Sequence, residues 1–377
     1  MKILIIHSFY SVDGGENKRV YEDLEMFKSE GHEVLLYSKK NVTNFLQDIF
    51  ELLISPFNPF VYFQLKRLIN KFKPDVIHIH NTWYKLGPAA YFALKISSAN
   101  VFQSLHNLRF FCANAFMLRS GKECTKCLDN RLFAVKYSCY KNRVLSALSS
   151  LHYFIIAKIN LFNQSNFYFF SPNFYFDSLI KNLFGLKDAN IIDFPNYVKD
   201  FQLIPEEKLN LPGEYYLIVG RNSNEKGLDQ FLKLWKSINI DTKLIIVSAD
   251  NLSVGNKNII YLNNTSDEQL AYIYKNSKGV IVPSNWVEGF PRVIIETSSV
   301  NKPIILSDKI AISKLDSLKN YAITFSLDSK ETLEKALKEL EVEINNPKFQ
   351  FRDWYIENFS KEAYLKNIFK KYEAKAK

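Results

Sequence analysis

Two glutamates, Glu288 and Glu296, flank a turn in the second half of this 377-residue chain. An apolar run, Gly279 to Val282, precedes the turn, and Pro291 opens a segment that can form a helix. In a parallel α/β sheet ligands bind where a strand ends and a helix begins, because unpaired backbone N–H groups and the helix dipole favour an anion there. One glutamate precedes the helix and the other lies more than a turn inside it. We therefore expect them to bind different parts of one extended ligand.

Two cations follow an earlier strand of the same half. Arg221 comes directly after the apolar run YYLIVG, and Lys226 precedes Gly227 and an amphipathic helix that we expect from Leu228 to Ile238. A guanidinium and an ammonium at a strand end can hold a diphosphate. Either residue alone would be an ordinary surface cation. Together with the glutamate turn, they favour a phosphate site.

The first half offers glycines and histidines at strand ends. Gly14 and Gly15 follow the first predicted strand; they permit positive φ and close backbone approach, as a phosphate site or a plain glycine turn would need. His80 and His106 end two further predicted strands. A histidine there suits proton transfer or hydroxyl binding near neutral pH, although a lone histidine is more often structural. We favour His106 because it leads into an unusual segment.

All four cysteines of the chain lie in that segment, an insertion over residues 109–143. They follow the spacing C-x11-C-x2-C-x11-C: Cys112, Cys124, Cys127 and Cys139. Four thiolates suit a tetrahedral zinc ion, which would be structural because no coordination position stays open. Four unliganded cysteines are the alternative. The insertion is also basic and aromatic, so it could rest on anionic lipid, hold a phosphorylated acceptor, or be a solvated loop.

Composition and charge narrow the function classes. The chain is 47% hydrophobic and has a net charge of +10, which favours an anionic partner. No RNP-type motif, zinc-finger spacing or heptad basic region supports nucleic acid. No apolar run is long enough for a transmembrane helix and no signal peptide is evident, so we expect a cytosolic protein. The Phe-rich stretch 45–72 predicts two short amphipathic helices, for which core packing is favoured over a membrane surface.

The remaining pattern alternates strands and helices in both halves. It predicts an α/β fold with two doubly wound parallel sheets, the second starting after a charged, proline-containing linker. We place the domains at 1–197, with the 109–143 insertion, and at 198–350. The tail, 351–377, is predicted as one long helix whose aromatic residues must cover a surface.

The motifs IVGRNSNEKG and VPSNWVEGFPRVIIE resemble the donor-binding core of the family 4 retaining glycosyltransferases, which have the GT-B fold. The resemblance spans nearly the whole chain. It implies two Rossmann-like domains facing a cleft, with a C-terminal helix crossing back to the first domain. It also implies a nucleotide-sugar donor, with UDP or GDP as the nucleotide, bound by the second domain, and an acceptor bound by the first.

Residue roles follow from the same resemblance. Arg221 and Lys226 would hold the donor diphosphate, and the backbone amides of Gly289 and Phe290 would face the sugar or phosphate. Glu288 would contact the sugar hydroxyls and Glu296 the ribose. Two residues of the first domain complete the assignment: Gly15 would close over the phosphate and His106 would lie on the acceptor side.

Two departures from the family pattern bear on mechanism. Asn196 is followed by tyrosine where many relatives carry glycine, and the chain has no DxD triplet. The missing triplet agrees with metal-independent transfer, in which cations of the protein neutralise the leaving diphosphate and no catalytic cofactor is needed.

The expected function is a retaining hexosyltransferase acting on a glycan or lipid-linked glycan acceptor in cell-surface polysaccharide biosynthesis. We expect it in the cytoplasm, peripheral to the inner face of the membrane. The alternatives are a GT-B-like nucleotide-sugar epimerase and a non-catalytic binder of anions or nucleic acid.

Overall fold

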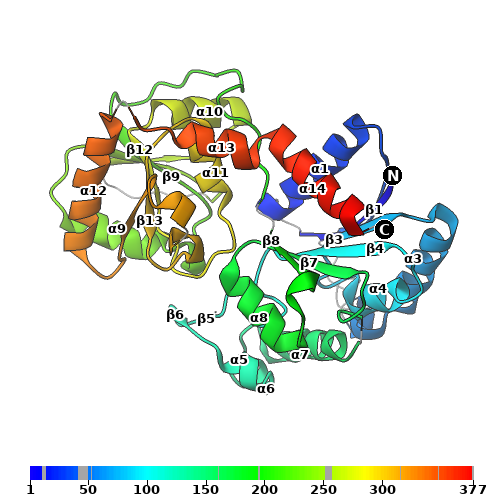
Figure 1. Cartoon of the computed structure of the whole chain (residues 1–377). Helices are drawn as coiled ribbons and strands as arrows, with labels where there is room; N and C mark the ends of the chain where they lie inside the picture. The colour runs from blue at the N-terminus through cyan, green and yellow to red at the C-terminus, as the bar shows by residue number, and fades with distance from the viewer. Residues whose placement is uncertain are drawn as a thin grey trace. The chain divides into compact units, whose positions relative to one another are not determined.

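The computed structural model describes residues 1–10, 14–40, 50–51, 53–159, 161–193, 196–250, 257–314, 316–346 and 348–375. The chain forms two compact units. The first comprises Met1–Pro195 and Asn367–Lys377, and the second Asn196–Lys366 (Figure 1).

The first unit is built on a six-stranded parallel sheet with the order β2-β1-β3-β4-β7-β8. Its strands are β1 (Lys2–Phe9), β2 (Glu33–Lys40), β3 (Val76–Asn81), β4 (Asn100–Ser104), β7 (Phe167–Ser171) and β8 (Ile191–Asp193). Residues 3–6 of β1 have no exposed surface, because neighbouring strands and covering helices enclose them. Burial on both faces explains why these strands read as continuous apolar runs.

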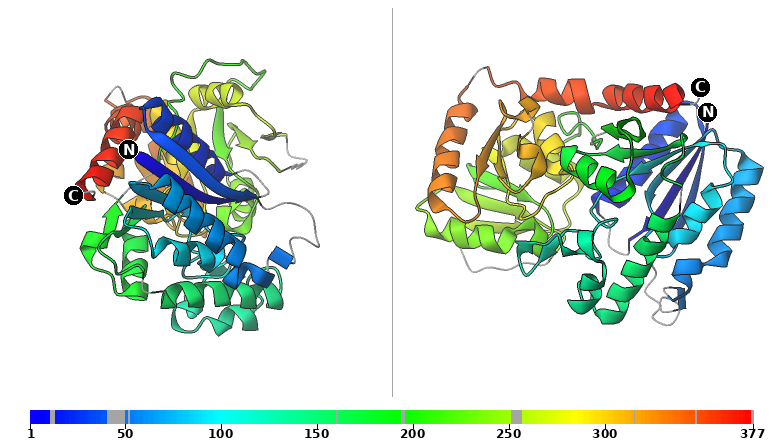
Figure 2. Two further views of the ribbon diagram at one scale, coloured as in Figure 1. Left: turned by 90° about the vertical axis from the view of Figure 1, so that its right-hand side faces the viewer. Right: turned by 60° about the horizontal axis from the view of Figure 1, so that its bottom comes forward.

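The longer helices described between these strands are α1 (Gly15–Ser29), α3 (Pro59–Phe72), α4 (Gly87–Leu94), α7 (Arg143–Lys158) and α8 (Phe174–Phe184). A short 3-10 helix, η1 (Ser55–Phe57), precedes α3. The insertion carries a small hairpin, β5 (Leu118–Arg119) and β6 (Lys122–Glu123), and two single-turn helices, α5 (Lys126–Asp129) and α6 (Leu132–Lys136). Figure 2 shows the α3 and α7 ribbons on the same side of the first unit.

The second unit repeats the plan with the order β11-β10-β9-β12-β13-β14. Its strands are β9 (Tyr215–Val219), β10 (Lys243–Val247), β11 (Ile259–Leu262), β12 (Gly279–Val282), β13 (Ile304–Ser307) and β14 (Ala322–Phe325). Its helices are α9 (Leu228–Ser237), α10 (Asp267–Asn276), α11 (Arg292–Ser299), α12 (Lys330–Ile344) and α13 (Phe351–Phe359), with the 3-10 helix η3 (Asn224–Lys226) before α9. The predicted α/β class with two parallel sheets is confirmed.

The tail forms two helices, so the prediction of one long helix is wrong. α13 ends at Phe359 and α14 (Lys361–Lys375) begins after Ser360, whose hydroxyl accepts a hydrogen bond from the Ala363 backbone N–H at 3.2 Å. This serine therefore caps the new helix. α13 packs into the core of the second unit through Phe351 and Tyr355.

The end of α14 belongs to the first unit. There the Tyr372 hydroxyl lies 2.8 Å from His78 Nδ1, and the Tyr372 ring lies 4.8 Å from that of Phe102. The aromatic side chains of the tail thus cover two different cores.

The Phe-rich stretch also departs from expectation. Residues 45–49 lie outside the described part of the chain, and α3 buries Val61, Leu65 and Ile69 as predicted for an amphipathic helix. Phe57, Phe60 and Phe63, however, are 68%, 64% and 64% exposed. The prediction that this stretch packs into the core is therefore wrong for three of its phenylalanines. In all described ranges, each helix is too short or too polar to cross a bilayer.

Candidate functional site

Two turns of the second unit meet at the carboxyl edge of its sheet. The turn after β9 ends in Gly227, with φ of +68°, and the turn after β12 begins at Pro283. A Cβ on Gly227 would lie 2.1 Å from the Pro283 carbonyl oxygen, so only glycine permits this approach. The Asn285 N–H donates to the Glu225 carbonyl at 2.8 Å and joins the turns. Sequence reasoning missed this contact, although a glycine just before a helix was its available signal.

The joined turns bring Lys226 and Glu288 together. The Lys226 ammonium donates to Glu288 Oε1 at 2.8 Å, and the Ser284 hydroxyl also donates to this carboxylate. Glu288 is 4% exposed, whereas the lysine side chain is 29% exposed. The buried carboxylate is thus fixed from two sides, and the cation stays within reach of solvent.

Arg221 lies beside this pair with a partner of its own. Its Nη2 is 3.4 Å from Glu225 Oε1, and its side chain is 54% exposed. Glu225 is held in turn by the Ser223 hydroxyl, which donates at 2.6 Å. Each predicted phosphate-binding cation therefore has a carboxylate partner, with which an incoming diphosphate must compete.

Glu296 lies within α11 and does not share these contacts. Its Oε2 accepts a hydrogen bond of 2.7 Å from the buried Tyr274 hydroxyl, and its Oε1 is 3.8 Å from Arg292 Nε. Burial and the adjacent carboxylate raise the pKa of Tyr274 well above its usual value, so the phenol keeps the proton that it donates. The two glutamates thus have separate surroundings, as expected for binding different parts of a ligand.

Pro291 occupies the N-cap of α11 and has no side-chain acceptor to cap the first turn. Just before it, Gly289 and Phe290 are buried. The Phe290 ring stacks on Trp354 of α13 with centroids 6.4 Å apart. Its carbonyl accepts from Asn196 Nδ2 at 3.0 Å. Asn196 therefore keeps a clear role although tyrosine follows it.

In the first unit, the two predicted histidines touch. His80 Nδ1 and His106 Nε2 lie 3.0 Å apart, and their rings are parallel within 6°. His80 Nε2 is 3.5 Å from Asp23 Oδ2, whose other oxygen accepts from Arg19 at 2.6 Å. Burial and neighbouring cationic groups hold the pKa of His80 well below its usual value. An array from Asp23 through His80 to His106 is therefore in place, with His106 at its partly exposed end.

Asp23, His78 and His80 also have potential metal-ligand atoms within 4.8 Å of one another. Their other contacts argue against a bound ion. The Arg19 guanidinium occupies Asp23, and the two His78 nitrogens face Ser104 and Tyr372 at 2.8 Å each. A divalent cation would have to take one His78 nitrogen from Ser104 or Tyr372, and it would lie beside the Arg19 guanidinium.

The glycine turn of the first unit leads directly into a helix. Gly14 is the N-cap of α1 with φ of −149°, which is extended backbone, and Gly15 is the first helical residue. Neither has a positive φ, so the left-handed conformation that glycine permits is not used at these two positions. Residues 11–13 of this loop lie outside the described residues. A Cβ at Gly14 would meet no atom within 4 Å, so the loop is open at that point.

Glu16, which sequence reasoning did not select, follows these glycines. Its Oε2 accepts from Asn107 Nδ2, next to His106, at 3.3 Å. Burial raises the pKa of this carboxyl to about 8, against the opposing effect of Arg109. Arg109 itself lies over the rings of Trp83 and Tyr140 at 4.9 and 5.3 Å. A glutamate in the first turn of a helix after two glycines was the signal available in the sequence.

Several buried histidines predict acid sensitivity of the first unit. Burial lowers the pKa of His7 to about 4 and of His152 to about 3. The unfolded chain takes up these protons near pH 6.5 and the folded chain does not, so stability is lost as pH falls from 6.5 towards 4. His7 alone contributes roughly 3 kcal/mol. Urea unfolding at pH 7 and pH 5 should show a large drop. Equal urea midpoints at the two pH values would contradict this prediction. A His152→Asn variant should lose less stability between pH 7 and pH 5.

The four cysteines gather around the small core of the insertion. The neighbouring Cys127 lowers the pKa of Cys112 to about 6, Cys112 Sγ lies 3.0 Å from Asn114 Oδ1, and Cys139 packs beside Cys127. That core contains three small buried residues, Ala113, Cys127 and Ala134. So small a core needs an additional cross-link, such as a structural metal ion, to be stable. Among the described residues, the thiols do not form a group of three or more sulfur atoms that all lie within 4.8 Å of one another. Zinc would therefore have to draw them together to a tetrahedral spacing.

Metal analysis tests the zinc prediction. Purified protein should contain about one zinc ion per chain, and a Cys124→Ser, Cys127→Ser variant should lose it. A chelator should lower the melting temperature of the wild-type chain but not of this variant. Zinc far below one ion per chain, with all four thiols reacting freely, would exclude the site.

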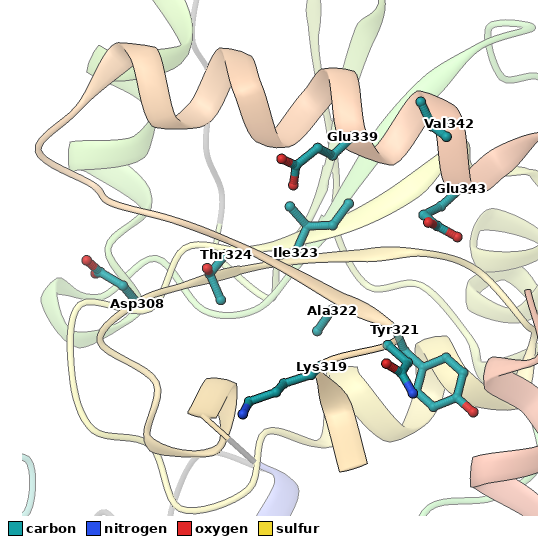
Figure 3. Close-up of a pocket in the computed structure, with 10 residues that line it drawn as sticks. Asp308, Lys319, Tyr321, Ala322, Ile323, Thr324, Glu339, Val342 and Glu343 are labelled. Carbon is teal, nitrogen blue, oxygen red and sulfur yellow. The ribbon is translucent and has the colours of Figure 1, made fainter. Parts of the chain in front are cut away.

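A surface groove of about 780 Å³ lies elsewhere on the second unit, between β14 and α12 (Figure 3). Lys319 and Asp308 line it together with Glu339 and Glu343 of α12. None of the predicted site residues lines this groove. It follows the edge strand of the sheet, and we assign it no role in the site.

Comparisons with known proteins show which class of protein this chain resembles. Residues 200–348 match the family described as glycosyl transferases group 1. Over 172 residues the chain is 29% identical to the serotype-specific mannosyltransferase WbdA of Escherichia coli. That match covers 41% of this chain and 21% of WbdA, so the chain spans about a fifth of this relative.

Solved structures share the fold over the whole chain. Sucrose-phosphate synthase from Thermosynechococcus elongatus matches with a TM-score of 0.71 and 14% identity, covering 99% of this chain and 98% of that one. Anabaena HepE in complex with UDP matches with a TM-score of 0.64 and 13% identity, covering 99% and 100%. The fold is that of the GT-B glycosyltransferases. Together with the family match, it confirms the resemblance drawn from the motifs of the second half.

Proposed function

We propose that the protein is a retaining glycosyltransferase. It transfers a sugar from a nucleoside-diphosphate sugar to a glycan or lipid-linked glycan acceptor in the synthesis of a cell-surface polysaccharide. The observation that carries this proposal is the contact between Lys226 and Glu288, made where two strand-end turns of the second unit join. The mannosyltransferase activity of WbdA and the UDP bound to HepE support the sugar-transfer class and the nucleotide donor.

Different residues of the joined turns can bind different parts of the donor. Arg221 and Lys226 would hold the diphosphate, and Glu288 would accept hydrogen bonds from the sugar hydroxyls. The N–H groups of Gly289 and Phe290 would face the sugar or phosphate, and Glu296 would bind the ribose. The two cations stabilise the negative charge that develops on the diphosphate as it leaves, without a metal ion.

The reaction would proceed on one face of the sugar. The bond from the anomeric carbon to the phosphate oxygen breaks, and the acceptor oxygen forms its bond on the same face. The acceptor proton passes to an oxygen of the departing diphosphate. A double displacement would need a carboxylate nucleophile about 5 Å from an acid. Glu288 is instead tied to Lys226 and Ser284, which favours a binding role.

We propose that the first unit binds the acceptor. His106 contacts His80 through Nε2 and lies at the partly exposed end of the array, where it would contact the acceptor. Glu16, with its raised pKa, can donate or accept nearby. Gly15, assigned to the donor phosphate by resemblance, remains a prediction.

Product analysis tests the reaction class. The chain, supplied with UDP- and GDP-sugars and a lipid-linked glycan extract, should consume donor only when acceptor is present and should keep the anomeric configuration. Conversion of the donor to an isomer without acceptor would indicate an epimerase. Salt-sensitive RNA binding without donor consumption would indicate a non-catalytic binder.

A further inference from the structure

The outward side of α7 is apolar where a surface helix is normally polar. The helix turns Ser146, Ser149 and His152 inward, and all are buried. Val144, Leu151 and Phe154 point outward and are 64%, 40% and 55% exposed. Tyr153 and Ile156 of α7 are buried as well, so the helix carries apolar side chains on both sides, whereas a surface helix normally keeps its outward side polar.

Two of the buried polar residues of α7, Ser146 and His152, have hydrogen-bond partners that fix the orientation of the helix. His152 Nε2 lies 2.6 Å from the hydroxyl of Ser55 in η1. The Ser146 hydroxyl donates to the Asn142 carbonyl at 2.8 Å and accepts from the Tyr140 N–H at 2.9 Å. The exposed apolar side chains are therefore not the result of a rotated helix.

The contact with Ser55 connects α7 to the second exposed group. η1 contacts α7 and leads directly into α3, whose solvent side carries Phe60 and Phe63. We call the exposed side chains of these elements the α3–α7 face: Phe57, Phe60, Phe63, Val144, Leu151 and Phe154. Figure 2 shows the two helices on one side of the unit. Scattered exposed apolar residues are ordinary, but a set gathered on neighbouring elements marks an interaction site.

The two segments that carry this face are basic in sequence. No acidic residue occurs between Glu51 and Asp75, a stretch with four Lys and Arg residues, or between Asp129 and Asp177, a stretch with five. Arg67 and Lys71 are exposed on α3, as are Arg143 and Lys158 on α7. Lys158 lies 5.8 Å from the Phe154 ring centroid, so a basic group directly borders the apolar surface.

We infer that the α3–α7 face binds an anionic lipid bilayer. Phenylalanines flanked by lysine and arginine fit the boundary between acyl chains and phosphate head groups. A second copy of the chain would place the same basic surface against itself across a two-fold axis, where like charges repel. This inference does not depend on sugar transfer, although it would bring the first unit to a lipid-linked acceptor.

Vesicle sedimentation of the full chain tests this inference without any substrate. The chain should sediment with vesicles of phosphatidylglycerol and phosphatidylcholine, bind pure phosphatidylcholine at least tenfold more weakly, and dissociate as salt is raised. A Phe57→Ser, Phe60→Ser, Phe63→Ser variant should bind at least tenfold more weakly. Because these side chains are exposed, its melting temperature should stay close to that of the wild type.

The second unit supplies the matched control. Leu203 and Val342 are 76% and 67% exposed, and a Leu203→Ser, Val342→Ser variant should bind the vesicles like the wild type. An Arg67→Glu, Lys71→Glu variant should lose the preference for phosphatidylglycerol. Failure of the wild type to bind anionic vesicles would overturn the inference. So would equal binding by the triple serine variant, or a concentration-dependent dimer that this variant abolishes.

Discussion

Replacing Lys226 with alanine should lower sugar transfer by about a hundredfold or more while the chain remains folded. The ammonium group lies at the junction of the two strand-end turns, where we place the diphosphate. Removal of one group that stabilises developing negative charge typically raises a barrier by about 3–4 kcal/mol. Initial rates at saturating donor and acceptor measure this effect, which should be in kcat because the charge develops as the bond breaks.

The alanine variant also leaves Glu288, which is 4% exposed, without its cation. Part of a rate loss could then come from local rearrangement. A Lys226→Ala, Glu288→Gln variant removes both charges and should be just as slow. Lys278→Ala is the matched control: this half-buried lysine pairs with Glu341 at 2.8 Å, also in the second unit, and its loss should leave transfer unchanged. Transfer by Lys226→Ala within a few-fold of the wild type would contradict the phosphate assignment.

Replacing Glu288 with glutamine should have opposite effects on transfer and on nucleotide binding. The amide can still accept a hydrogen bond from Ser284 but no longer neutralises Lys226. The released ammonium should then bind a free nucleoside diphosphate about tenfold more tightly, which corresponds to about 1.4 kcal/mol. Transfer should fall at least tenfold, because the donor sugar loses a charged acceptor for its hydroxyls.

Calorimetric titration with UDP and GDP, beside initial rates, separates these two effects. Glu341→Gln, which breaks the corresponding pair with Lys278, serves as the control and should alter neither quantity. If Glu288→Gln weakened nucleotide binding and transfer equally, the carboxylate would be acting on the whole turn and not on the sugar. Unchanged transfer would remove Glu288 from the site.

The sheets were predictable because their strands are buried on both faces and so appear as continuous apolar runs, as residues 3–6 do. The pairing of Lys226 with Glu288 was predictable as proximity, since both follow strands of one sheet. The contact that fixes this pairing was not predictable, because the approach of Gly227 to Pro283 depends on how two turns fold against each other. Gly14 and Gly15 permit a positive φ but do not adopt one, because Gly14 caps α1 in extended backbone and Gly15 begins the helix.

Contacts between distant elements set the limit of sequence reasoning in the first unit. The array from Asp23 to His106 joins α1, β3 and the segment after β4, and no local spacing connects them. The inward Ser146 and Ser149 of α7 share the buried side with Tyr153 and Ile156, so polarity alone does not identify the face of α7 that meets the core. In the tail, Ser360 divides an otherwise continuous helical pattern because its hydroxyl caps a second helix.

The most direct test of the account is a thermal-shift panel of UDP-, GDP- and ADP-sugars on the wild-type chain and on Lys226→Ala and Lys278→Ala. A ligand that binds the folded state raises the melting temperature. We predict a rise of at least about 2 °C with one nucleotide series, retained by Lys278→Ala and lost by Lys226→Ala. No shift with any nucleotide sugar, or an equal shift in Lys226→Ala, would contradict a donor site at the joined turns of the second unit.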